Sequence, residues 1–318
     1  QIVSSNLWKI VFEKMKELQI IGLEQEGKNA GCWVIKSEGN DEDKVVVRSN
    51  GIATYIAKDI PYAAWKLGIL EDPFYYTKYG EQPGGKTLWQ TVLEKNTNAK
   101  LDFTGEKVIT VIDSRQSRLQ KIITKLMSSF KSQEGAYVHL GYEAVTLSAE
   151  TAKMLNVDTG GKQIQMSGRK GIYVNADYVL DILGVRTYEE AKKRNPELDE
   201  VRLVEIAELV AVGALRYTMI KQDLDKIITF DMMESLSLEG DTGPYIQYAH
   251  ARASRILEKA GMEPKFNVSF DNLNTDHEIN LIKMIGKFDI QIEDAAKNLS
   301  PKVIARYCYD LAVAFNAF

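Results

Sequence analysis

Val108-Ile109-Thr110-Val111-Ile112 and Tyr137-Val138-His139-Leu140 are two apolar runs that enclose a segment with helical spacing. In that segment, 116–130, apolar side chains recur three and four residues apart, which is the spacing of one helix face. Continuous apolar runs bounded by polar turns are typical of buried parallel strands. Strand, helix and strand in this order predict a βαβ unit and an open α/β sheet.

The sequence changes character on the two sides of this unit. Upstream, Val45-Val46-Val47 is a further short run of β-branched residues. From about residue 176 onward, long helical patterns cover 201–217, 245–261 and 276–288, with few runs of β character. The predicted fold class is therefore α/β followed by all-α.

The composition excludes several classes of protein. The 318 residues hold 40 Lys and Arg against 44 Asp and Glu, a formal net charge of −4, which excludes a uniformly basic nucleic-acid coat. No stretch approaches the roughly 18 uncharged apolar residues of a membrane span. Cys32 and Cys308 are too few for a disulfide framework, which favours a reducing compartment, the cytoplasm. The apolar pattern from Tyr309 to Phe318 ends without a helix-stopping residue, which predicts that the chain is part of a longer protein.

Residues 80–87, Gly-Glu-Gln-Pro-Gly-Gly-Lys-Thr, satisfy the phosphate-loop pattern G-x-x-x-x-G-K-T. A working phosphate loop follows a buried strand and offers successive backbone N–H donors. Here the preceding run, 74–79, is aromatic but polar, and Pro83 removes one donor. A Gly/Pro turn that leads into a helix at Leu88 is favoured, with a P-loop ATPase as the alternative.

A second Gly-rich and basic stretch, Gln165-Met166-Ser167-Gly168-Arg169-Lys170-Gly171, lies between the two halves. Its glycines allow close approach of the backbone, and Ser167 can donate a hydrogen bond. Arg169 and Lys170 can neutralise the charge that develops on a pyrophosphate leaving group. On composition alone, a solvated turn is the commoner explanation of such a loop.

With its neighbours, this loop resembles the mobile Lys-Met-Ser-Lys-Ser signature of class I aminoacyl-tRNA synthetases, in the form typical of arginyl-tRNA synthetases. Residues 48–60, Arg-Ser-Asn-Gly-Ile-Ala-Thr-Tyr-Ile-Ala-Lys-Asp-Ile, resemble the arginine-pocket segment of that family. Residues 240–252, Gly-Asp-Thr-Gly-Pro-Tyr-Ile-Gln-Tyr-Ala-His-Ala-Arg, resemble its domain junction. Residues 111–116 are similar to the strand end and loop that supply a substrate-contacting Gln, and the longer insertion before them resembles archaeal members. The blocks follow the order of the family, which makes 80–87 a turn in that insertion.

The resemblance implies an arginine–tRNA ligase whose partners are L-arginine, ATP and the tRNA for arginine, with no DNA and no membrane. Mg²⁺ would accompany ATP as part of the substrate, and neither a tightly bound cofactor nor a protein-held metal is expected.

Three residues are assigned to arginine recognition by the resemblance: Tyr55, Asp59 and Gln116. On a helix, the i, i+4 spacing of Tyr55 and Asp59 places a phenol and a carboxylate on one face. A carboxylate can accept two charge-assisted hydrogen bonds from the planar fork of a guanidinium. Without the family match, Asp59 would be interpreted as a solvated helix charge and Tyr55 as a packing residue. Pro61 could end or kink the helix.

The catalytic residues implied by the resemblance lie in the mobile loop, which would close over the ATP phosphates. They are Met166, Ser167, Gly168, Arg169 and Lys170. In strict register the second signature lysine falls on Gly168, and Arg169, Lys170 or a lysine elsewhere could replace it.

The other class I signature, His-Ile-Gly-His, is not found in the sequence. His139-Leu140-Gly141-Tyr142 matches it in part, and the resemblance treats this segment as a strand. The remaining histidines, His250 and His277, stand in other patterns. The chain is therefore expected to lack the first half of its nucleotide fold and to be unable to activate arginine alone.

The helical pattern after Gly243-Pro244 carries aromatic and basic side chains at three- and four-residue spacing. They are Tyr245, Tyr248, Arg252, Arg255 and Lys259. Such a stripe can contact phosphates and stack bases, although a solvated helix face is the commoner explanation. A similar basic run on the helix after Gln116 consists of Arg115, Arg118, Lys121 and Lys125.

The resemblance divides the chain after residue 185. Residues 1–185 would be the C-terminal part of a Rossmann-type nucleotide-binding catalytic domain, with an insertion near 70–107. Residues 186–318 would be a truncated helical domain for stem contact and anticodon binding. A non-catalytic helical tRNA-binding module is a further alternative, in which tRNA binding does not need the residues before about 176.

Overall fold

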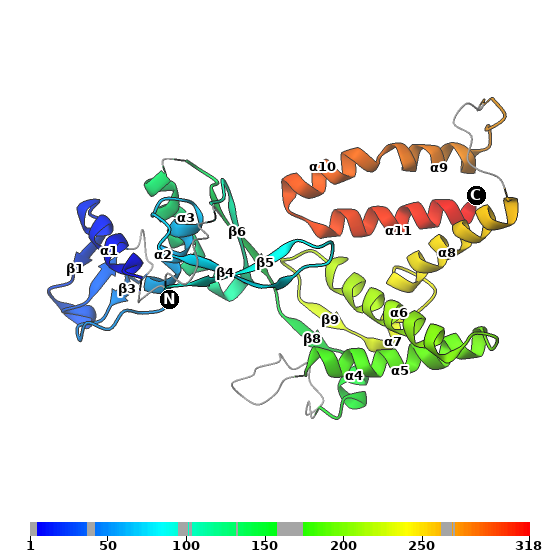
Figure 1. The fold of residues 1–318 in the computed structure, drawn as a ribbon, viewed down its shortest axis with the longest axis horizontal. Coiled ribbons are helices and arrows are strands. Elements are labelled where there is room, and N and C mark those ends of the chain that lie inside the picture. Colours follow the sequence, from blue (N-terminus) through cyan, green and yellow to red (C-terminus); the bar gives the residue numbers. More distant parts are fainter. Residues whose placement is uncertain are drawn as a thin grey trace. The chain divides into compact units, whose positions relative to one another are not determined.

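The chain divides into two compact units, Gln1–Gly141 and Tyr142–Phe318 (Figure 1). The structure is a computed structural model, and it describes residues 5–36, 42–94, 101, 104–131, 133–157, 174–261, 269 and 271–318. Each unit has a hydrophobic cluster of its own. The helix α5 (Ala176–Arg194) runs without interruption through the domain boundary predicted after residue 185. That boundary, as a division of function, stays a prediction.

Two amphipathic helices form the centre of the first unit. α1 (Leu7–Glu17) packs against α2 (Ile56–Lys66). Apolar side chains four residues apart lie at their contact and are buried, because this spacing brings them to one face of each helix. They are Leu7, Val11 and Met15 on α1 and Ile56 and Ile60 on α2.

A small antiparallel sheet joins the same core. It consists of β1 (Ile21–Leu23), β2 (Trp33–Ile35) and β3 (Lys44–Val47), paired in that order. Val46 is fully buried, so the sheet contributes one apolar face to the helices. The short 3₁₀ helix η1 (Gly27–Asn29) lies between β1 and β2 along the chain.

Residues 80–87, which match the phosphate-loop pattern, form the turn of a hairpin and the strand residues next to it. β4 (Tyr75–Glu81) and β5 (Thr87–Val92) pair antiparallel, and Gln82 donates its amide to the carbonyl of Lys86 at 2.8 Å across the turn. Gly84 and Gly85 have φ of 91° and 78°, which glycine adopts without strain. The predicted turn is confirmed, but the predicted helix at Leu88 is wrong. Leu88 lies on β5, and because this strand begins at Thr87, directly after Lys86, the strand–loop–helix geometry of a phosphate site is not formed.

The strand–helix–strand order predicted around residue 116 is confirmed. β6 (Val108–Asp113) leads through the 3₁₀ helix η2 (Ser114–Gln116) into α3 (Ser117–Lys131), and β7 (Tyr137–Tyr142) pairs with β6. The expected burial of β6 is wrong, because its exposure alternates and Val111 is 64% exposed. Across the described part of the chain, the strands form small sheets of two or three strands and not one open sheet.

The second unit begins with a parallel strand pair between distant segments. β8 (Val145–Leu147) pairs with β9 (Ile228–Phe230), and α4 (Ala149–Met154) follows β8 directly. Along the chain, the long helices α5 and α6 (Glu200–Ile220) come between α4 and β9. They pack side by side (Figure 1). The short helix α7 (Met232–Ser235) follows β9.

The remaining helices confirm the all-α character of the C-terminal region. α11 (Pro301–Ala317) contacts α8 (Gly243–Ala260), α9 (Asp276–Gly286) and α10 (Phe288–Asn298). In Figure 1, α9 and α10 follow one another alongside α11. Thr275 and Glu278 form a capping box that begins α9.

Candidate functional site

The first turn of α2 is fixed to β3 by a threonine. Thr54 Oγ1 donates to the carbonyl of Val45 at 2.9 Å, and the Thr54 amide donates to the carbonyl of Val46 at 2.9 Å. The preceding chain reverses at Gly51, whose φ of 79° lies in the region that favours glycine. This anchor holds the chain directly before α2, and so it fixes the positions of Tyr55, which precedes the helix, and of Asp59 in its first turn.

Asp59 is half-buried on the first turn of α2. Burial raises the pKa of its carboxyl group above the usual value, and the positive charge of Lys58 offsets part of this effect. Among the described residues, Asp59 forms no ion pair. A partly desolvated carboxylate without an ion pair is able to accept a guanidinium, because the incoming charge would compensate for the water that burial has removed.

Tyr55 keeps helical spacing with Asp59, but its ring lies in a different environment. The Asp59 amide donates to the Tyr55 carbonyl at 3.4 Å, whereas the Tyr55 side chain is 84% exposed. The Lys58 ammonium lies 5.8 Å from the centre of its ring. Tyr55 lines an open cleft of about 720 Å³ together with Thr54 and Arg118. The structure thus places the phenol in solvent and the carboxylate half inside the unit.

Pro61 does not end the helix, since α2 continues to Lys66 with Pro61 inside it and buried. The proline cannot donate a backbone hydrogen bond. Its burial with the apolar side chains of α2 contributes packing in return.

Gln116 lies exposed on η2, at the start of α3. The Asp113 carboxylate fixes this turn by accepting the backbone amide of Arg115 at 2.8 Å and its Nε at 2.7 Å. These bonds hold the pKa of Asp113 below its usual value. They also occupy the Arg115 guanidinium, the first cation of the basic run that leads into α3.

A buried polar pair, which the sequence did not single out, lies next to Asp59. Gln120 is 2% exposed, and its Oε1 accepts the hydroxyl of Tyr137 at 2.9 Å. Burial raises the pKa of Tyr137; a hydrogen bond with Thr110 lowers it, and the charge of Asp59 raises it further. The Asp59 carboxylate therefore lies close enough to Tyr137 on β7 for its charge to act on the phenol. The available signal was the position of Gln120, four residues after Gln116 and three before the buried Ile123.

His139 contacts the backbone of the neighbouring strand. It lies on β7, and its Nε2 is 3.0 Å from the carbonyl oxygen of Ile112 on β6. This contact joins the two strands. The segment 139–142 belongs to β7, as the resemblance predicted. The Nε2 atom of His139 contacts the backbone of β6.

The predicted catalytic loop residues Met166, Ser167, Gly168, Arg169 and Lys170 lie outside the described residues. Downstream of them, α5 begins at Ala176, where Asn175 Oδ1 accepts the amide of Asp177 at 2.9 Å. Their catalytic role stays a prediction.

The basic and aromatic stripe on α8 is divided between packing and exposure. The Tyr245 ring lies 5.5 Å from the Tyr309 ring on α11, while Tyr248 is 52% exposed. Arg252 donates to Asn316 Oδ1 on α11 at 3.0 Å. Arg255 forms an exposed ion pair with Glu258 at 2.8 Å. Tyr248 and the two arginines therefore remain reachable from solvent, whereas Tyr245 serves the contact between α8 and α11.

Within the described ranges, no group of three His, Cys, Asp or Glu side chains is arranged to hold a metal ion. Within the same ranges, no helix is both long and apolar enough to cross a membrane.

Comparison with known proteins gives consistent results for both units. Residues 246–318, which include most of α8 and all of α9 to α11, match the DALR anticodon binding domain family. The arginine–tRNA ligase of Thermococcus sibiricus is 34% identical over the whole of this chain and 49% of its own length. An arginine–tRNA ligase of Thermus thermophilus is 35% identical over 92% of this chain and 47% of its own length.

A solved structure extends the similarity to three dimensions. The Thermus thermophilus arginyl-tRNA synthetase superimposes with a TM-score of 0.81 at 33% identity, over 99% of this chain and 50% of that one. The chain spans about half the length of the curated relatives it matches.

The α/β region and the helical region that matches the anticodon binding domain family are together similar to part of an aminoacyl-tRNA synthetase. The similarity is to the arginyl-tRNA synthetases, and it extends along the whole of this chain.

Proposed function

We propose that the chain carries arginine-recognising and tRNA-binding parts of an arginine–tRNA ligase. The observation that carries this proposal is the Asp59 carboxylate, half-buried and without an ion pair among the described residues, on a helix turn anchored by Thr54. Asp59 would accept the guanidinium of arginine, with Tyr55 and Gln116 as further contacts. The planar fork of arginine would be favoured over the single ammonium of lysine on geometry as well as charge.

In the proposed reaction, the carboxylate of arginine attacks the α-phosphate of ATP, and pyrophosphate leaves with its Mg²⁺. This step forms arginyl adenylate. A hydroxyl of the terminal ribose of the tRNA then attacks the carbonyl carbon of the adenylate, so that the ester bond to the tRNA forms and AMP leaves. Positioning and charge stabilisation would supply most of the catalysis. The loop residues Met166, Ser167, Gly168, Arg169 and Lys170 would close over the phosphates.

Calorimetric titration with arginine, lysine and citrulline tests the pocket. Arginine is expected to bind the chain, and citrulline, which keeps the shape but not the charge, is expected to bind at least tenfold more weakly. Asp59→Asn is expected to abolish the difference between arginine and citrulline. Glu106→Gln, which changes an exposed carboxylate of the same unit, serves as the matched control. Equal binding of arginine and citrulline by the unaltered chain would contradict the assignment.

We also propose that these 318 residues do not activate arginine without further protein. The support is the sequence, whose only histidines are His139, His250 and His277, and the contact of His139 with the backbone of β6. ATP–pyrophosphate exchange measures activation directly. An exchange signal that depends on arginine would overturn this second proposal without affecting the first.

The α8 stripe supports the proposed tRNA partner, since it lies largely in the region that matches the anticodon binding domain family. Filter binding of a total tRNA pool at fixed salt, followed by identification of the retained tRNAs, tests this part. Enrichment of arginine acceptors is expected.

The unpaired thiols of Cys32 and Cys308 support the proposed cytoplasmic location.

A further inference from the structure

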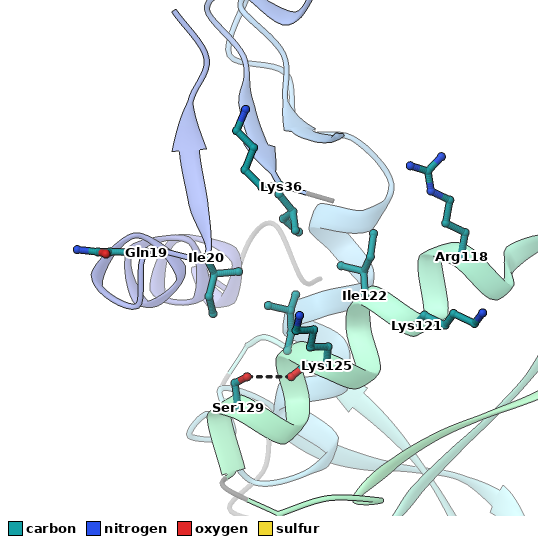
Figure 2. Close-up of a pocket in the computed structure, with 10 residues that line it drawn as sticks. Gln19, Ile20, Lys36, Arg118, Lys121, Ile122, Lys125 and Ser129 are labelled. Carbon is teal, nitrogen blue, oxygen red and sulfur yellow. Dashed lines mark hydrogen bonds between the residues drawn. The ribbon is translucent and has the colours of Figure 1, made fainter. Parts of the chain in front are cut away.

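A groove of about 490 Å³ in the first unit has an apolar floor and a cationic rim (Figure 2). It lies between α3, the residues that follow α1, and the end of β2. Ile20, Ile35 and Ile122 contribute to the floor. Arg118, Lys121 and Lys125 contribute positive charge to the rim, and Figure 2 shows them in succession along α3.

The three cations share one face of a firmly held helix. Their spacing of three and four residues brings them to the same side of α3, and all three are exposed. The opposite side is fixed by the buried Ile123 and Met127 and by the bond from Tyr137 to Gln120. The cations are therefore presented by a rigid element and not by a loop.

Their extent along α3 fits a chain of negative charges. Arg118 and Lys125 are seven positions apart on the helix, a rise of about 10 Å. Over that length one nucleic-acid strand carries roughly three phosphates. A single small anion would engage only part of such a row.

Carboxylates balance the positive charge on one side of the groove. Lys36 on its far side donates to Asp43 Oδ2 at 2.8 Å and also pairs with Glu24, and these bonds raise the pKa of its ammonium group. Its side chain extends away from α3 in Figure 2. On α3, Lys121 forms no ion pair among the described residues. The charge of Lys36 at the β2 end is therefore balanced by carboxylates, whereas within the described ranges the charge of Lys121 on α3 is not.

We propose that this groove binds the ribose-phosphate backbone of the tRNA, with the phosphates along Arg118, Lys121 and Lys125 and the sugars over the isoleucine floor. The proposal rests on the proposed function for the identity of the RNA. It adds a contact surface in the first unit to the stripe on α8.

The test uses the full chain and a tRNA for arginine, with affinity measured by filter binding over a range of salt concentrations. Lys121→Ala/Lys125→Ala is expected to weaken binding roughly fivefold to tenfold and to lower the slope of log affinity against log salt by about 1.5, close to 0.7–0.9 per lost phosphate contact. Lys121→Arg/Lys125→Arg is expected to retain both values. Lys9→Ala/Lys86→Ala removes two exposed charges from elsewhere in the unit and is expected to change neither.

The outcomes separate this proposal from the proposed function. If the groove and control pairs behave alike while arginine acceptors are still enriched, the groove proposal is overturned and the proposed function stands. If the unaltered chain shows no preference for arginine acceptors, the proposed function fails, and the salt slope still decides whether the groove binds RNA. Competition by inorganic phosphate as strong as competition by RNA would identify a small-anion site and overturn the proposal.

Discussion

Tyr217 on α6 donates its phenolic hydrogen to the carboxylate of Asp241 at 2.5 Å, and the same hydroxyl lies 3.3 Å from the carbonyl oxygen of Ala305 on α11. Lys221 supports the same loop by donating to the carbonyl of Asp241 at 2.7 Å. Burial first, and the Asp241 carboxylate second, raise the pKa of Tyr217, so its hydroxyl stays protonated and acts as a donor. One phenol thus connects α6, the loop before α8, and α11.

Tyr217→Phe is expected to lower the free energy of unfolding by about 1–3 kcal/mol, because Asp241 loses a donor at a partly buried position. Urea unfolding measures the change. Tyr188→Phe is the matched control, since the Tyr188 hydroxyl contacts Glu200 at 3.3 Å in an exposed position. Its effect is expected to stay below about 0.5 kcal/mol. Equal losses in the two variants would show that the Asp241 contact has no special weight.

Because of Asp59, the free energy of unfolding is expected to depend on pH. Because burial raises the pKa of Asp59, the folded chain keeps a proton there at pH values where the unfolded chain has released it. Stability from this group therefore falls as pH rises from the usual Asp value through the raised one. Asp59→Asn is expected to remove that fall and to be more stable at neutral pH, by less than about 1 kcal/mol because the carboxyl is half in solvent.

The check is a series of urea midpoints for both proteins from about pH 4 to about pH 7. The difference between Asp59→Asn and the unaltered chain should widen with pH. A constant difference would mean that the carboxyl titrates alike in the folded and unfolded chain. Together with the expected loss of arginine selectivity, a stabilised variant would indicate that folding free energy is given up at this position for binding.

Tyr245 and Tyr248 should respond differently to the same substitution. Tyr245→Ala removes the ring contact with Tyr309 and is expected to lower the free energy of unfolding by about 2–3 kcal/mol. Tyr248→Ala is expected to leave stability nearly unchanged and to weaken tRNA binding roughly tenfold, the loss of one stacked base. Unfolding and filter-binding measurements on both variants decide the matter. Loss of stability in Tyr248→Ala would identify it as a packing residue instead.

Lys86→Ala is expected to leave Mg-ATP binding unchanged, since Lys86 belongs to the turn between β4 and β5. Equilibrium dialysis with labelled ATP measures this directly. Loss of nucleotide binding in Lys86→Ala would restore the P-loop alternative.

The helices were predictable because their apolar residues repeat over several turns. The pattern 201–217 corresponds to α6 (Glu200–Ile220), and the pattern 276–288 corresponds to α9, after which α10 begins at Phe288. Leu88 lies on a strand and not on the predicted helix because the residues around it, and not the preceding glycines, decide the structure there. Thr87, Leu88 and Trp89 favour a strand, and pairing with β4 stabilises it.

The environment of the candidate site could not be derived from local sequence. The charge of Asp59 acts on Tyr137, which is far away in the chain, and the groove depends on Ile20 and Ile35 meeting α3. Periodicity identified the cations of α3 as one stripe. It could not show that Arg115 is occupied by Asp113 while Arg118, Lys121 and Lys125 border a groove.

The hairpin between β4 and β5 bears on how genomes are interpreted. Eight letters that match a nucleotide-hydrolysis signature here form a reversal between two antiparallel strands. A search that compares sequence letters alone would assign nucleotide hydrolysis to this chain. Asking whether the lysine and threonine open a helix distinguishes the two cases, and the question can be put to any sequence for which coordinates exist.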